Sequence, residues 1–218
     1  MNKGFTLIEL TICVTIFVGM TVLLIVKYGS FNQSTLLTDL SYDIALVMRQ
    51  AQTYGLSVVN ASQGSASFQY SYGISFSTYT LQASDDQSKA GSTRAILFAD
   101  SYPLNGNNSV GNGAYDLTSR VPASSDLAQS VYNLTRGAKI SKLCVGTGNV
   151  TGSIPECSTL VGELDITFKR PDPTAIIRSV ANGTINSPSP YAEVTIAGTD
   201  GSTRTLAVSS NGQISILQ

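Results

Sequence analysis

The chain opens with a long apolar run that contains a single charged residue. The twenty-two residues from Phe5 to Val26 carry one charge, at Glu9. A helix of that length, at about 1.5 Å per residue, is about 33 Å long, close to the hydrocarbon thickness of a bilayer. The pattern predicts a membrane-spanning helix over residues 5–26, preceded by a short polar leader over residues 1–4.

From residue 27 onward the apolar positions become periodic. They recur at steps of three and four residues, and polar residues such as Asp39, Asp43 and Arg49 fall between them. This spacing predicts an amphipathic helix over residues 27–56 with one stripe that packs against a sheet. The stripe consists of Leu36, Leu37, Leu40, Ile44, Val47, Met48, Ala51 and Tyr54. Together the two segments predict one N-terminal helix of about fifty residues, or about 75 Å.

After the helix the pattern changes to short alternating runs typical of strands. Gly198-Thr199-Asp200-Gly201 predicts a hairpin, and Asn211-Gly212 predicts a second tight turn, so the chain should end in an antiparallel meander. Residues 100–126 predict an irregular connection, and a short helix is expected over 126–134. Strands are expected over 56–59, 68–76, 94–99, 139–145, 163–168, 175–180, 191–196, 203–208 and 213–217. The fold class is therefore α+β, with a β-rich domain over residues 57–218.

Composition narrows the possible chemistry. The chain has no histidine, which excludes Ser-His-Asp and Cys-His catalysis and histidine-bearing metal sites. No spacing of Asp or Glu indicates a catalytic pair or a calcium loop, so the acids are expected to be solvated surface groups. With a net charge of -1, nothing calls for nucleic acid. We expect no enzyme activity, no cofactor and no metal.

The three cysteines fall into two settings. Cys13 lies in the apolar run and is expected to pack as a small apolar residue. Cys144 and Cys157 bracket a segment rich in glycine and turn formers, which predicts a loop closed by a disulfide worth about 3 kcal/mol in an oxidising compartment. Two free thiols are the alternative, and a thiol count under denaturing conditions separates the two.

The start of the apolar run also differs from a secretory signal. No small-residue cleavage site follows it, and a carboxylate at Glu9 costs about 2.5–3.5 kcal/mol on membrane-insertion scales. Residues 3–10, Lys-Gly-Phe-Thr-Leu-Ile-Glu-Leu, resemble the class III signal of type IV pilins and type II secretion pseudopilins. The alternative is an uncleaved anchor in which Glu9 reaches toward the membrane interface.

The resemblance implies a specific maturation and assembly. A prepilin peptidase would cut between Gly4 and Phe5 at the bacterial inner membrane, and Phe5 would be N-methylated. Glu9 would then pair with the Phe5 amine of a neighbouring subunit, since a carboxylate and an ammonium buried together cost less than either alone. The implied protein is a single-pass subunit, with its C-terminal domain outside the cytoplasm, that assembles with other subunits into a pilus or pseudopilus.

A narrower similarity joins the chain to the pseudopilin H and minor pilin T group. It rests on Arg49, Ala51 and Gly55 before the strands and on the ending around Asn211-Gly212. The residues also have a plain structural interpretation, in which Ala51 and Gly55 let the helix approach a sheet and Arg49 is solvated. A pilus-associated receptor for DNA or a surface is the alternative function. The basic residues Arg136, Lys139, Lys142, Lys169, Arg170 and Arg178 are nevertheless expected to be solvated strand-edge groups.

Overall fold

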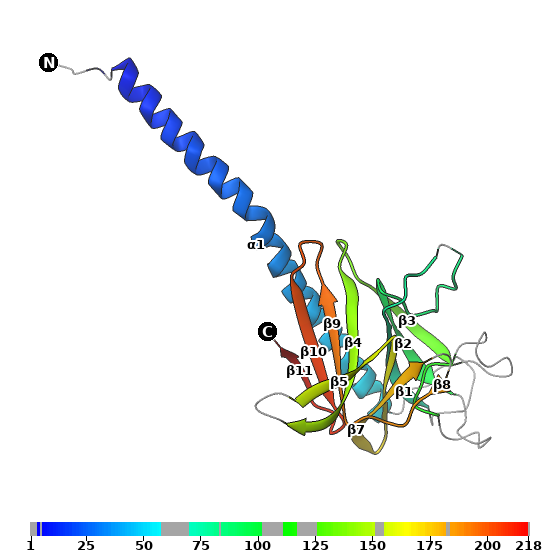
Figure 1. Cartoon of the computed structure of the whole chain (residues 1–218). Coiled ribbons are helices and arrows are strands. Elements are labelled where there is room, and N and C mark those ends of the chain that lie inside the picture. Colours follow the sequence, from blue (N-terminus) through cyan, green and yellow to red (C-terminus); the bar gives the residue numbers. More distant parts are fainter. Residues whose placement is uncertain are drawn as a thin grey trace.

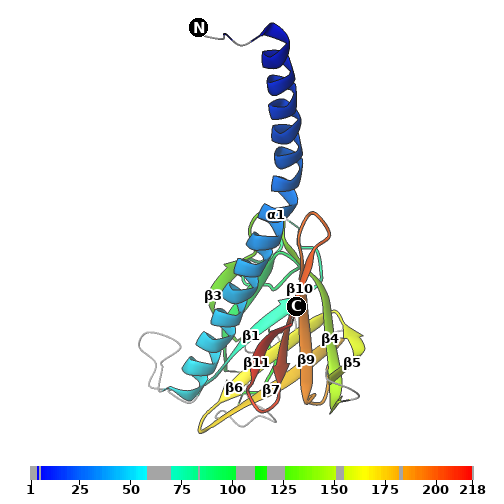
Figure 2. The ribbon, with the colours of Figure 1, turned by 90° about the vertical axis from the view of Figure 1, so that its left-hand side faces the viewer.

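One long helix leads into a β-rich domain. The computed structural model describes residues 4, 6–57, 70–82, 84–101, 111–116, 126–150, 155–181 and 184–217, of which 26–32, 147–150 and 155–156 are described by backbone alone. Helix α1 (Leu7–Leu56) has 50 residues, in agreement with the predicted length. Its first half projects away from the domain and its second half lies along it (Figures 1 and 2). The predicted α+β class is confirmed.

The strands form two antiparallel sheets rather than one. The first has the order β3-β2-β1-β6-β7-β8 and the second the order β11-β10-β9-β4-β5. The last three strands form the predicted C-terminal meander. The strands are β1 (Ser71–Ser77), β2 (Arg94–Asp100), β3 (Leu127–Asn133), β4 (Lys139–Val150), β5 (Pro155–Val161), β6 (Glu163–Lys169), β7 (Asp172–Ala181), β8 (Thr184–Ile185), β9 (Tyr191–Ala197), β10 (Thr203–Ser209) and β11 (Ile214–Leu217).

Three predicted elements need correction. The helix expected over residues 126–134 is wrong, because Leu127–Asn133 is strand β3, paired with β2. The loop expected between the cysteines is mostly a hairpin, because β4 continues to Val150 and β5 begins at Pro155. The strand expected at 56–59 begins inside α1, and residues 58–59 lie outside the described range. Most of the irregular connection over 100–126 also lies outside it. Of its described residues, Asp100 ends strand β2, and residues 101, 111–116 and 126 belong to no named strand.

The core lies where the apolar stripe of α1 meets both sheets. The stripe buries Leu37, Leu40, Ile44, Met48 and Ala51, and it leaves Leu36, Val47 and Tyr54 partly buried. These residues join one cluster with apolar side chains from the middle strands of the two sheets. Burial of side chains of this size stabilises a fold by roughly 1.5–3 kcal/mol each, so the stripe holds α1 firmly to the domain.

The end of α1 approaches β6 at a glycine. A Cβ atom at Gly55 would collide with the backbone of Phe168, so only glycine permits this separation. The helix continues one residue further to Leu56, and its C-cap is Ser57. Gly55 therefore serves the close approach of helix and sheet. Arg49 is exposed, as predicted.

Candidate functional site

The resemblance assigns its functional residues to the first turn of α1. Thr6 is the N-cap, and its hydroxyl accepts a hydrogen bond from the Glu9 amide (3.3 Å). The Glu9 carboxylate in turn accepts from the Thr6 amide (3.0 Å) and the Thr6 hydroxyl (2.7 Å). This is a capping box, which satisfies amide groups that the start of a helix leaves without intrahelical partners. The role of Thr6 was not predicted, although a Thr three residues before a Glu at the start of an apolar run is the sequence signature of a capping box.

Neutral donors alone satisfy the Glu9 carboxylate. In the described part of the chain, Lys89 and Asp85 of the β-rich domain (the β-domain) form an ion pair. Glu9 forms no ion pair within the described residues. Hydrogen bonds from a hydroxyl and an amide stabilise a carboxylate only in part when it lies in apolar surroundings. A cation near Glu9 would therefore stabilise it further in a membrane or a protein interior.

The predicted cleavage position lies just before the capping box. Gly4 is exposed, and a Cβ atom added there would meet nothing within 4 Å. Phe5, the predicted site of methylation, lies outside the described residues. The backbone on the amino side of the helix is thus uncovered at Gly4, as cleavage by a peptidase requires.

The apolar half of α1 (Leu7–Ile25) is the segment of the described chain that is long and apolar enough to cross a membrane. None of it is buried in the structure, and Leu7, Phe17 and Leu24 are more than two-thirds exposed. Its threonine hydroxyls donate to backbone carbonyls of the preceding turn: Thr11 to Ile8 (2.9 Å), Thr15 to Thr11 (2.7 Å) and Thr21 to Phe17 (2.8 Å). The half therefore presents apolar surface with its hydroxyl groups satisfied, as an apolar environment demands.

Polar contacts fix the packed half of α1 (residues 33–56) to the β-domain. Near its start, the Arg204 guanidinium donates to the hydroxyls of Ser34 and Thr38, both at 3.3 Å. Near its end, the Gln52 amide donates to the carbonyls of Pro173 (3.3 Å) and Gly212 (3.2 Å). Each contact joins residues more than 120 positions apart in sequence, so these contacts fix the direction of α1 relative to both sheets.

The end of α1 is closed by residues of the turn after β6. The Arg170 amide donates to the carbonyl of Gly55 (3.1 Å), and the Arg170 guanidinium donates to that of Ser57 (3.0 Å). These bonds satisfy terminal helix carbonyls that lack an intrahelical donor. Arg170 is therefore a helix-capping residue, which corrects the expectation that it is a solvated strand-edge group.

The other basic residues differ in exposure. Arg136, Lys139 and Lys142 are exposed, as predicted, whereas Lys169 and Arg178 are partly buried. The Arg178 guanidinium donates to the carbonyl of Asn186 (2.9 Å).

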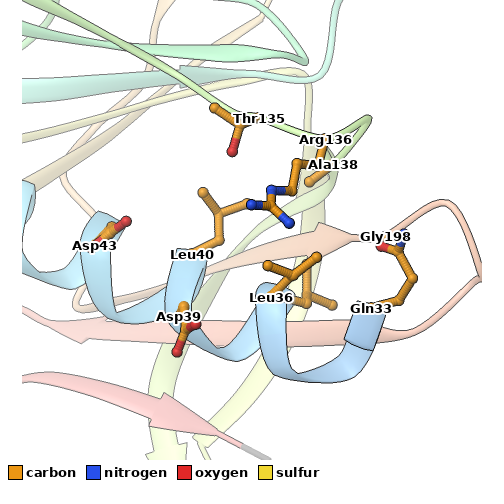
Figure 3. A pocket seen from close by; sticks show the side chains of 10 residues that line it. Gln33, Leu36, Asp39, Leu40, Asp43, Thr135, Arg136, Ala138 and Gly198 are labelled. Atoms are coloured by element: carbon orange, nitrogen blue, oxygen red, sulfur yellow. The ribbon is translucent and has the colours of Figure 1, made fainter. Parts of the chain in front are cut away.

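A small cavity lies between the packed half of α1, the turn that joins β3 to β4, and the β9–β10 hairpin (Figure 3). It encloses about 170 Å³ and is lined by Gln33, Leu36, Leu37, Asp39, Leu40, Asp43, Thr135, Arg136, Ala138 and Gly198. Arg136 reaches over Leu36 and Leu40, while Asp43 accepts a hydrogen bond from the Tyr132 hydroxyl (3.3 Å). Its lining mixes both signs of charge with leucines and holds no recognisable catalytic arrangement.

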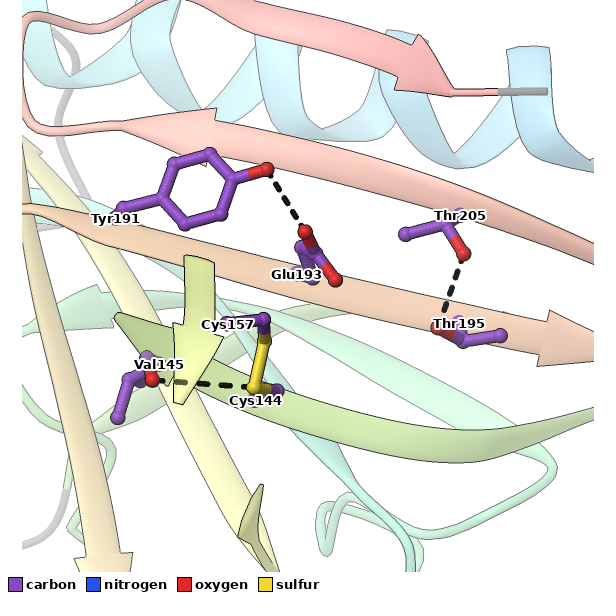
Figure 4. Close-up of a disulfide and its surroundings, with 7 residues drawn as sticks. All are labelled: Cys144, Val145, Cys157, Tyr191, Glu193, Thr195 and Thr205. Carbon is purple, nitrogen blue, oxygen red and sulfur yellow. Dashed lines mark hydrogen bonds between the residues drawn. A yellow bond between two sulfur atoms is a disulfide. The ribbon is translucent and has the colours of Figure 1, made fainter. Parts of the chain in front are cut away.

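The predicted disulfide is present. Cys144 of β4 and Cys157 of β5 are joined across neighbouring strands, with their Cα atoms 5.7 Å apart (Figure 4). Nearby on β9, the Tyr191 hydroxyl donates to Glu193 (2.9 Å). The disulfide thus ties the β4–β5 hairpin, at the edge of the second sheet, near the point where β4 pairs with β9.

Four acidic residues contradict the expectation of solvated surface acids. Asp100, Asp116, Asp126 and Asp165 are each at most 6% exposed. Three of them accept backbone amides from residues 111–116: Asp100 from Gly113 (2.8 Å), Asp165 from Tyr115 (3.0 Å) and Asp126 from Asp116 (2.8 Å). These carboxylates accept backbone hydrogen bonds that a neighbouring strand would accept in a regular sheet. They therefore hold residues 111–116, which form no regular strand, in place.

Burial also changes the titration of one of these acids, Asp100. Desolvation, together with the nearby charge of Asp126, raises the pKa of Asp100 well above its ordinary value. One carboxylate oxygen of Asp100, Oδ1, is buried without a hydrogen-bond partner. Across the ranges that the structure describes, no group of three or more Asp, Glu or Cys side chains is arranged to hold a metal ion.

Comparison with known proteins adds no further assignment. No protein-family model, curated protein or solved structure matches this chain.

Proposed function

We propose that this chain is a type IV pilin-like structural subunit. In this proposal a prepilin peptidase cleaves between Gly4 and Phe5, Phe5 is N-methylated, and the subunit is anchored by one helix in a bacterial inner membrane. The domain that follows lies outside the cytoplasm. The mature subunit then enters a pilus or a secretion pseudopilus, as a minor pilin or pseudopilin.

The contrast between the halves of α1 is the observation that carries the proposal. The packed half is anchored to the domain by its buried stripe, whereas the apolar half is exposed and carries one acid without an ion pair in the described chain. A membrane can cover that apolar surface in the unassembled subunit. Neighbouring helices can cover it in a filament, and a neighbour's Phe5 amine would supply the cation that Glu9 lacks.

The antiparallel sheets support the same proposal. A long N-terminal helix packed on antiparallel strands is the arrangement expected of the pilin fold, and here the helix direction is fixed at both ends of the packed half by Arg204 and Gln52. Such a rigid connection would transmit the position of the helix in a filament to the domain outside.

Substitution of Glu9 tests the proposal. Glu9→Ala removes the acid but leaves the packed half untouched, so the domain should remain folded and the chain should stay in the membrane. Filament assembly, measured by electron microscopy and by recovery of sheared filaments, should fall at least tenfold. Glu9→Asp, which keeps the charge, serves as the matched control and should retain more assembly than Glu9→Ala.

Two outcomes would overturn the structural role. Filament assembly that does not change with Glu9→Ala would show that assembly does not depend on this acid, as expected if the chain is a plain anchor and not a subunit. Intact filaments after deletion of the whole chain, with loss of DNA uptake or adhesion, would instead favour the receptor function.

A further inference from the structure

The packed half of α1 leaves one apolar surface uncovered. Tyr42 and Leu46, one turn apart on α1, are 59% and 63% exposed. Together with Ala45 and Arg49 of α1 and Ile214 and Ile216 of β11 they line a groove of about 470 Å³, here called the Tyr42–Leu46 groove. Strand β11 is the edge strand of the second sheet and contacts α1, so it forms one wall of the groove.

The bilayer cannot cover this groove. Tyr42 follows the end of the apolar half, Ile25, by seventeen residues, or about 26 Å of helix. The headgroup layer extends only about 5–8 Å beyond the hydrocarbon on each side. If the apolar half spans the membrane, the groove lies well outside it and needs a protein to cover it.

The groove continues a face that the apolar half also exposes. Leu24 precedes Tyr42 by eighteen residues, or about five full turns at 3.6 residues per turn, and Phe17 lies on the same face about two turns earlier. Leu24 and Phe17 are 72% and 71% exposed. A helix that packs along this face in the apolar half would reach the groove by continuing in the same direction.

The charges on the packed half fit a second copy of the same helix. The charged residues from Gln33 to Leu56 are two acids, Asp39 and Asp43, followed by one base, Arg49, and all three are exposed. A parallel copy shifted along the axis by six or ten residues, about 9 or 15 Å, would place its Asp43 or Asp39 level with Arg49. The groove then takes apolar side chains while Arg49 pairs with an acid of the other copy.

We infer that the Tyr42–Leu46 groove receives helix α1 of a second copy of this chain, running parallel and shifted so that Arg49 faces an acid of that copy. The inference deepens the proposed function, because a shared membrane orientation makes the helices parallel. It adds an interface outside the apolar helices, formed by one turn of α1 and the edge strand β11.

Site-specific photocrosslinking of the full-length chain in membranes tests this inference. The photoreactive residue p-benzoylphenylalanine replaces Leu46 or, in a second variant, Tyr42. Val131 and Leu160, exposed apolar residues on edge strands β3 and β5, are the matched control positions. The expected result is an adduct of twice the chain mass from positions 42 and 46, mapped by peptide analysis to α1 of the second copy, and little from 131 and 160.

Charge variants sharpen the result. Arg49→Glu should lower the adduct from position 46 by about threefold, because an exposed ion pair becomes a repulsive one. Combining Arg49→Glu with Asp39→Lys and Asp43→Lys should restore it. Absence of the double-mass adduct, equal yield from position 160, an adduct to a different protein, or mapping outside α1 would each overturn the inference.

The intact mass of the same samples separates this inference from the proposed function. Removal of residues 1–4 without the double-mass adduct would overturn the groove as an interface and leave the pilin-like assignment standing. The adduct in a chain that retains residues 1–4 although a prepilin peptidase is present would support the interface and count against the assignment.

Discussion

The two halves of α1 belong to one continuous helix, but their apolar side chains are covered in different ways. In the packed half the apolar stripe is covered by strands of the same chain, and Ile44 and Met48 are fully buried. In the apolar half every turn is exposed, and the acid Glu9 accepts its hydrogen bonds within the described chain from Thr6. The packed half thus belongs to the folding of one chain, whereas the apolar half presents surface that only a membrane or another protein can cover.

The largest expected effect comes from the packed half. Ile44→Ala should lower the free energy of unfolding of the β-domain by about 3 kcal/mol, because it leaves a cavity where α1 meets both sheets. Ile16→Ala, at a position 54% exposed in the apolar half, should change it by less than about 0.5 kcal/mol. Denaturant unfolding of the full-length chain in detergent measures the free energy of unfolding of both variants. Equal decreases in the two variants would contradict the difference between the halves.

The disulfide is expected to contribute to the stability of the domain by a similar amount. Reduction, or the paired substitution Cys144→Ser with Cys157→Ser, should destabilise the β-domain by about 3 kcal/mol and leave the apolar half unaffected. A thiol count of the denatured chain should give one thiol before reduction, from Cys13, and three afterwards. Three thiols before reduction, in a chain isolated from an oxidising compartment, would show that the cysteines are not paired.

A smaller effect is expected at the buried acids. Because burial raises the pKa of Asp100, the folded state binds its proton more tightly than the unfolded state does. The contribution of Asp100 to stability is therefore largest at low pH and is lost as pH rises through the folded pKa. Asp100→Asn removes the buried charge and keeps an acceptor for the Gly113 amide, so it should stabilise the domain at pH 7.5 by roughly 1–2 kcal/mol, and less at lower pH.

Asp85 provides the matched control for this substitution. Its carboxylate accepts the Gln82 amide, and this hydrogen bond lowers the pKa of Asp85, so Asp85→Asn should give no stabilisation at pH 7.5. The free energy of unfolding measured from pH 4.5 to 8 compares the two variants. Destabilisation by Asp100→Asn throughout this range would show that the ionised carboxylate is required.

The smallest effect on domain stability is expected at the start of the apolar half. Thr6→Ala removes the N-cap and should cost about 1 kcal/mol locally, seen as faster hydrogen exchange over residues 7–10. The unfolding midpoint of the β-domain should not move, because this turn contacts none of the described domain. A shift in that midpoint would connect the two halves energetically and contradict their separation.

Local patterns in the sequence were enough to predict α1 and the meander, because both depend on periodicity and turn residues close together in the chain. Leu127–Asn133 was assigned wrongly because its apolar spacing and the preceding Asp126 resemble a capped helix. In the structure Asp126 accepts amides from Ser101 and Asp116, and the segment pairs with β2. These partners are distant in the sequence or set by the path of the chain, so no local pattern contains them.

The candidate site also contains features that local sequence patterns predict and features that they do not. The Glu9 and Cys144–Cys157 predictions rested on short motifs and spacing, and the structure places Glu9 in the first turn of α1 and joins the two cysteines. The division into two sheets, the capping role of Arg170 and the burial of Asp100 and Asp165 depend on contacts between distant strands. Sequence periodicity shows which face of an element is buried but not which element covers it.

Intact-mass and N-terminal analysis, with the chain produced in the presence and absence of a prepilin peptidase, tests the central claim most directly. The account predicts that residues 1–4 are lost and that Phe5 gains a methyl group only when the peptidase is present. A chain that keeps Met1 to Gly4 under both conditions would contradict it, and the apolar half would then be a plain anchor.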